Sequence, residues 1–263
     1  MDHLFCKDIS IFAFPANLIA LLFLVAGTWF LHRYYSRHRF VKWLCSVPAT
    51  LLFTGLTIGM LVVEGIWALE LYRTWIMILL QLTLLLILGL VVLKRSRPLS
   101  RRNAVFLLNH AGLWLALAFA LFGAPDREEY KMIAPLHQKE YTAFDANGVI
   151  YPLPFTVRLD RFELEYYPGQ DGQKVPKRFC SSLTLESGRQ QKSVQVEVNK
   201  PASFKGYALY QDGYDQNLGE NTSYSIMLVV KDPWISGVYA GIFLLLAGAI
   251  GSIIYGPVKK LNA

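Results

Sequence analysis

The feature that most constrains this chain is a set of five apolar runs, each close to the length of a helix that crosses a bilayer. About 20 helical residues, rising about 1.5 Å each, span the roughly 30 Å of hydrocarbon in a membrane. The runs are Ile11–Leu31, Leu44–Val63, Trp75–Leu93, Ala104–Ala124 and Val238–Ile254. The sequence therefore predicts a membrane protein with five transmembrane α-helices.

Positive charge gathers at alternate ends of these runs and predicts their orientation. Three segments without Asp or Glu hold the basic residues Arg33, Arg37, Arg39, Lys42, Lys94, Arg95, Arg97, Arg101, Arg102, Lys259 and Lys260. Because such residues mark the cytoplasmic side, we expect the N-terminus outside and the C-terminus inside. The net charge of +7 then reflects orientation, and no nucleic-acid partner is expected. No basic segment precedes the first run, so we expect a retained helix rather than a signal peptide.

The segment 125–232 between the fourth and fifth runs predicts an extracytoplasmic antiparallel β-domain. Asn147-Gly148 is a hairpin signal. Val157 and Leu159 alternate in one phase and Phe162 and Leu164 in the other, which predicts a bulge near Asp160–Arg161. Six or seven short strands of this kind favour a β-sandwich or an open barrel. The expected organisation is a membrane domain at 1–124, the β-domain at 125–232, and the fifth helix with a cytoplasmic tail at 233–263.

His110 is the one histidine inside an apolar run. Ionisable side chains are costly in hydrocarbon and usually mark a functional site or a polar partner. One interpretation is an interhelical hydrogen bond, for example to Gln81 or Thr83 or to the counterpart of Asn109 on a neighbouring protein. The other is a cofactor ligand, since Trp114 lies four residues later on the same helical face and an aromatic beside an imidazole suits a flat macrocycle such as haem.

Other candidate residues have weaker signals. Glu64 and Glu70 are expected to be a solvated helix end rather than a proton site. Cys6 and Cys180 would both lie outside, so a disulfide between them stays open. Gly237 and Gly241 form a small-residue face that predicts close packing of the last helix against another helix, in a partner protein or elsewhere. No common catalytic motif is present in the sequence.

Several stretches, taken in order, resemble the ResB (Ccs1, CcsB) family of system II cytochrome c biogenesis proteins. They are Phe40–Phe53, Val157–Leu159, Glu165–Tyr167, Pro176–Ser181, Val198–Asp215 and Lys231–Pro233. The chain departs from the family pattern in its extra first helix and its short outer domain. The resemblance covers roughly residues 40–254.

The resemblance implies a role in the bacterial inner membrane, where a CcsA/ResC-type partner and this chain would export haem and attach it to apocytochrome c. His110 matches the family's histidine before the outer domain, an axial haem ligand. Arg101 and Arg102 would then pair with the propionates. The chain is not expected to be an enzyme alone but a subunit of a holocytochrome c synthetase complex. The alternative is a membrane-anchored β-domain that binds envelope partners and has no haem role.

Overall fold

The computed structural model describes residues 9–67, 74–98, 100–167 and 175–255. It divides into two compact units. The helical unit comprises Met1–Asp126 and Trp234–Ala263, and the β unit comprises Arg127–Pro233. The sheet thus lies, along the chain, between the fourth and fifth long helices.

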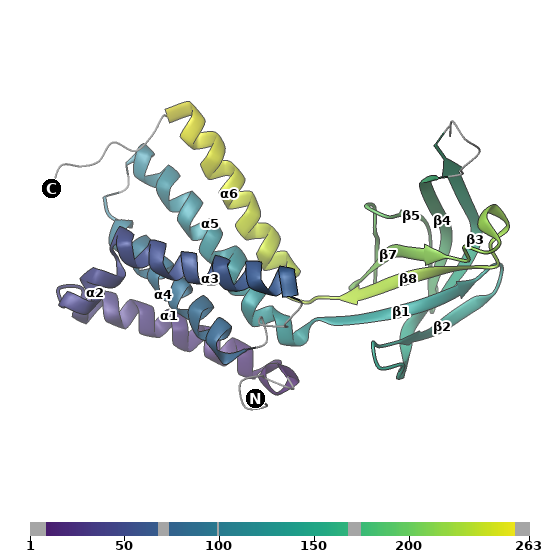
Figure 1. The fold of residues 1–263 in the computed structure, drawn as a ribbon, viewed down its shortest axis with the longest axis horizontal. Coiled ribbons are helices and arrows are strands. Elements are labelled where there is room, and N and C mark those ends of the chain that lie inside the picture. Colours follow the sequence, from purple (N-terminus) through teal and green to yellow (C-terminus); the bar gives the residue numbers. More distant parts are fainter. Residues whose placement is uncertain (1–8, 68–73, 99, 168–174, 256–263) are drawn as a thin grey trace. The chain divides into compact units, whose positions relative to one another are not determined.

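Six α-helices build the helical unit (Figure 1): α1 Ala16–Tyr35, α2 Arg39–Leu44, α3 Val47–Trp67, α4 Trp75–Arg95, α5 Arg101–Gly123 and α6 Ile235–Tyr255. Among the described residues, five of them, all but α2, are long and apolar enough to cross a membrane. Their number, length and composition indicate a multi-pass membrane protein. The short helix α2 lies within the first basic segment and was not predicted.

Helix ends follow the local sequence. Thr74 begins α4 by accepting a hydrogen bond from the Met77 N–H at 3.3 Å, and Ser100 begins α5 in the same way with Asn103 at 3.2 Å. Helix α1 continues to Tyr35, so His32 lies in its last turn rather than in a loop. A polar end of this kind stays helical because long side chains reach water while the stem remains against the helix.

Helices α5 and α6 lie side by side (Figure 1) and contact each other through small residues. A Cβ atom built on Gly241 would lie 2.5 Å from the Ala116 backbone nitrogen and 2.7 Å from the Gly112 carbonyl oxygen. Asn109 adds a hydrogen bond of 3.3 Å to the Ser252 hydroxyl. The predicted close packing of the last helix against another helix is therefore confirmed, and that helix is α5 of the same chain.

Helices α1, α4 and α5 share an apolar core. Leu21, Leu85, Ala118 and Phe122 are buried together, with Trp114 packed against them. Phe12, just before α1, meets Trp75 at the start of α4 with ring centroids 5.9 Å apart. Further along, a Cβ on Gly89 would lie 3.0 Å from Cγ2 of Thr28. The two contacts show that α1 and α4 run parallel, so their basic last turns lie at the same end.

The described residues of the β unit form one antiparallel sheet of eight strands in the order β5-β4-β3-β2-β1-β8-β7-β6. The strands are β1 Glu128–Pro135, β2 Lys139–Phe144, β3 Ile150–Tyr166, β4 Pro176–Ser187, β5 Gln190–Glu197, β6 Ala202–Phe204, β7 Tyr207–Tyr214 and β8 Tyr224–Lys231. The register shifts between Leu159 and Arg161, which confirms the predicted bulge. The Asn147-Gly148 turn joins β2 to β3, with Gly148 at a φ of 80°.

The sheet curls so strongly that strands distant in its order meet across the interior. The Ser181 hydroxyl on β4 lies 2.9 Å from the Ser225 hydroxyl on β8, although three strands separate them in the sheet. The rings of Phe155 on β3 and Phe204 on β6 are 5.4 Å apart. The predicted antiparallel domain is confirmed, as a single curled sheet with more strands than the six or seven expected.

Candidate functional site

His110 is held by its own helix. Its Nδ1 lies 2.9 Å from the Phe106 carbonyl oxygen, which can only accept, so Nδ1 carries the proton. The imidazole also stacks on the Phe106 ring, with centroids 3.7 Å apart and planes 21° from parallel. Nε2 then bears the lone pair, and it makes no hydrogen bond within the part of the chain that the structure describes.

This hydrogen bond bears on one of the two interpretations of His110, the interhelical hydrogen bond. The imidazole bonds to Phe106 rather than to Gln81 or Thr83 of α4, and the Thr83 hydroxyl donates to the Leu79 carbonyl at 2.7 Å. Among the described residues His110 therefore forms no hydrogen bond to another helix, and its role as a cofactor ligand stays a prediction. Its half-buried ring presents an oriented nitrogen that suits a metal ligand.

Arg95 brings a positive charge to the other ring of this stack. Its guanidinium carbon lies 4.6 Å from the centroid of the Phe106 ring. The turn between α4 and α5 holds it there, because the Asn103 side chain donates to the carbonyls of Arg95 and of Pro98, the latter at 2.8 Å. The sequence marked Arg95 only as an orientation charge, since its neighbour Phe106 depends on how α4 and α5 pack.

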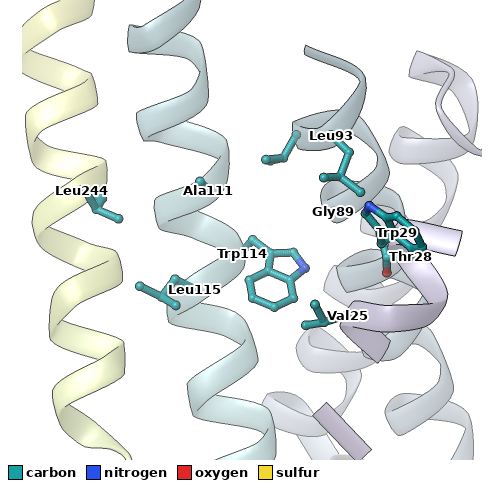
Figure 2. Close-up of a pocket in the computed structure, with 10 residues that line it drawn as sticks. Val25, Thr28, Trp29, Gly89, Leu93, Ala111, Trp114, Leu115 and Leu244 are labelled. Atoms are coloured by element: carbon teal, nitrogen blue, oxygen red, sulfur yellow. The ribbon is translucent and has the colours of Figure 1, made fainter. Parts of the chain in front are cut away.

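Trp114 was expected to share the helical face of His110. Its side chain instead forms a hydrogen bond with helix α4. Its indole Nε1 donates to the Leu85 carbonyl of α4 at 3.0 Å. Figure 2 shows the indole among residues of α1, α4 and α5, where it lines a cavity of about 410 Å³. His110 is not among the residues that line this cavity.

The other two predicted residues begin α5. Arg101 is exposed in the first turn, and Arg102 follows it in the helix with a side chain outside the described set. Both precede His110 by two to three helical turns. Together with Arg95 they place three basic residues on the same side of His110 along α4 and α5.

Comparison with known proteins places this geometry in a family. The profile of the ResB-like family matches residues 100–228, which include His110 and most of the β unit. Over these residues, about half of its length, the chain is ResB-like.

Two individual proteins are similar to this ResB-like chain. Protein NrfI of Wolinella succinogenes is 29% identical over 105 residues, which are 39% of this chain and 11% of that protein. The solved structure of cytochrome c haem lyase CcmF is 15% identical and covers 78% of this chain and 34% of that one, with a TM-score of 0.38. This score is too low to establish a shared fold. The chain spans a small part of either protein.

A second polar centre of the ResB-like protein lies at the opposite end of the helical unit and was not predicted. The Asp126 carboxylate accepts hydrogen bonds from the Phe14 backbone N–H at 2.8 Å, the Asn17 amide at 2.8 Å and the Trp234 indole at 2.6 Å. Asn17 is only 3% exposed and also donates to the Phe122 carbonyl. This cluster joins the start of α1, the end of α5 and the start of α6.

The remaining candidates are dispersed. Glu64 has one buried carboxylate oxygen without a hydrogen bond among the described residues, so it is less solvated than expected. Glu70 and Cys6 lie outside the described residues, whereas Cys180 is buried in the β unit. His137 lies in the β unit, after β1. Within the described residues no group of three His, Cys, Asp or Glu side chains is placed to hold a metal.

Proposed function

We propose that this ResB-like protein handles haem in cytochrome c biogenesis, with Nε2 of His110 as an axial ligand of the iron. The observation that carries the proposal is the hydrogen bond from Nδ1 to the Phe106 carbonyl, 2.9 Å long. With the proton on Nδ1, the lone pair lies on Nε2, where a metal can bind. Histidine ligands usually donate a hydrogen bond from the ring nitrogen that does not bind the metal. Axial ligation by histidine is common among haem proteins.

The surroundings of His110 fit a flat, partly anionic group. Phe106 covers one face of the imidazole and contributes an aromatic surface. Arg95 lies over Phe106, and Arg101 begins the same helix, so positive charge is available for propionates. When bound, haem supplies the vinyl groups that form thioethers with cysteines, whereas this chain's residues hold and orient it.

A partner is needed to complete this function. The sequence has five histidines, and none of the other four lies in the apolar part of a span. We therefore propose that a CcsA/ResC-type membrane protein supplies a second ligand and that the pair delivers haem to apocytochrome c. In this proposal both proteins lie in the bacterial inner membrane, with the β unit and the haem acceptor outside the cytoplasm.

The test is a visible absorbance spectrum of the chain co-purified with that partner, comparing wild type with His110→Gly. We expect the variant to lose most of its haem and the partner-dependent maturation of cytochrome c. Added imidazole should restore part of both by filling the vacated space. His32→Gly at the end of α1 is the matched control and should keep its haem. A His110→Gly protein with full haem content and full maturation would favour the membrane-anchored scaffold instead.

A further inference from the structure

The cavity beside Trp114 is a partly open pocket lined by residues of four helices, α1, α4, α5 and α6. Figure 2 shows Val25 and Trp29 of α1, Leu93 of α4 and Leu115 of α5 around it. Its volume of about 410 Å³ lies in the range of ligand-binding cavities. Because the helices cross hydrocarbon, a space of this size fills with an apolar group from the surroundings.

The lining of the cavity is almost entirely apolar. The Thr28 hydroxyl donates to the Leu24 carbonyl of its own helix at 2.7 Å. The Trp114 indole N–H is bonded to the Leu85 carbonyl at 3.0 Å. Trp29 adds a second indole N–H, and the other lining residues carry apolar side chains or, at Gly89, none. The lining therefore favours a hydrocarbon chain over a charged head group.

Basic residues at one end of the cavity indicate which head group is attached to the hydrocarbon chain. Arg33 follows the lining residue Trp29 by four positions and Arg95 follows Val92 by three, so each lies one turn beyond the lining. His32 and Lys94 lie in the same last turns. Helices α1 and α4 run parallel, so these residues gather at one end, and segments 32–46 and 94–103 contain no Asp or Glu.

We infer that the cavity holds one acyl chain of an anionic phospholipid, whose head group lies against the basic ends of α1 and α4. Basic residues at a membrane surface attract anionic lipid, and an apolar groove next to them holds the chain. His110 does not line the cavity, whereas Arg95 belongs both to this basic end and to the surroundings of His110, so the variants below leave Arg95 unchanged.

The probe is phosphatidylglycerol with a nitroxide on its acyl chain, added to the full-length protein in phosphatidylcholine vesicles and followed by electron spin resonance. We expect an immobilised component that spin-labelled phosphatidylcholine does not give. Ala111→Leu fills the cavity and should reduce this component roughly tenfold. Ala120→Leu, the same change at an exposed position of α5, should leave it unchanged.

Two further variants separate the chain from the head group. Arg33→Gln should weaken the preference for phosphatidylglycerol about fivefold while leaving the helical content unchanged. Val25→Phe fills the cavity from α1 and repeats the test if Ala111→Leu does not fold. Equal immobilisation of the two lipids, or an immobilised component that survives both cavity-filling changes, overturns the inference. Co-purification of an isoprenoid quinone in place of phospholipid also overturns it.

Discussion

Trp234 and Asp126 are joined by a hydrogen bond of 2.6 Å between the indole Nε1 and a carboxylate oxygen. The two residues lie on either side of the inserted β unit, 108 positions apart in the sequence. The same carboxylate accepts from Phe14 and Asn17, so one acidic side chain connects three helices. The Asp126 carboxylate is partly buried, and its removal would take the shared acceptor away from these donors.

Asp126→Ala is expected to destabilise the helical unit by about 2 to 3 kcal/mol, lowering its thermal midpoint by about 5 °C. Tryptophan fluorescence of the detergent-solubilised protein during heating measures the change. The control is Asp212→Ala, which removes a surface ion pair of 2.9 Å with Lys131 in the β unit. Such pairs contribute little, so this variant should unfold with the wild type. Equal midpoints for all three proteins would show that the Asp126 cluster does not hold the helices together.

Gly241→Ala is expected to disrupt the packing of α5 on α6. The added methyl group meets backbone atoms at 2.5 to 2.8 Å, and neither helix can yield locally. We expect the free energy of unfolding to fall by about 2 kcal/mol, which thermal denaturation measures. Gly55→Ala is the matched control, because a Cβ there has no atom within 4 Å. Alanine favours a helix over glycine, so the control should be unchanged or slightly more stable.

Arg95→Gln should lower the haem retained by the complex about fivefold, if the proposed ligation by His110 is correct. The reason is the loss of a positive charge one ring away from the imidazole. Haem per protein is measured by the pyridine haemochrome spectrum. Arg39→Gln in α2 removes an equal charge from another basic segment and should retain haem. An equal loss in both variants would indicate a general effect of charge rather than a role for Arg95.

The stability of the β unit should depend on acid through Glu197. The hydrogen bond from Arg178, 2.7 Å long, lowers the pKa of Glu197 from 4.5 to about 2, and Lys200 adds to the effect. Because the folded pKa is depressed, the stabilisation is complete above pH 4.5 and disappears as the pH falls towards 2. Circular dichroism during denaturation should show Glu197→Gln less stable than wild type at pH 7 and equal near pH 2. A pH-independent difference would contradict this assignment.

The proposed orientation predicts where a periplasm-dependent reporter works. Insertion at the turn Asn147-Gly148 should give activity, because this loop would lie outside the cytoplasm. A fusion after Phe40, in the basic segment between α1 and α3, should give none. Activity measured on whole cells distinguishes the two positions. The reverse pattern would invert the topology of every span.

Patterns within one element were predictable from the sequence. The apolar runs locate the five long helices, and the phase change between Leu159 and Phe162 locates the bulge in β3. Each signal depends only on neighbouring residues. The first apolar run predicted that the helix ends at Leu31, whereas α1 continues to Tyr35. His32 interrupts the hydrophobic pattern but not the helix.

Contacts between distant elements were not predictable in the same way. Asn17 is an ordinary polar residue until α1 packs beside Asp126, 109 positions away. Arg95 became relevant to His110 only through the turn that places α4 against α5. The glycines of α6 did predict close packing, but their pattern carries no information about which helix is the neighbour.

The sheet order has an evolutionary consequence. Strands β1 and β8, the first and last of the β unit, pair along their full length from Glu128 with Lys231 to Pro135 with Tyr224. The chain therefore enters and leaves the β unit on adjacent strands, and the Asp126–Trp234 bond joins the two residues that flank this unit in the sequence. A segment whose two ends lie on paired strands can be lengthened between them without separating those ends. Homologues are therefore expected to differ in the length of the β unit without a change in the register of α5 on α6.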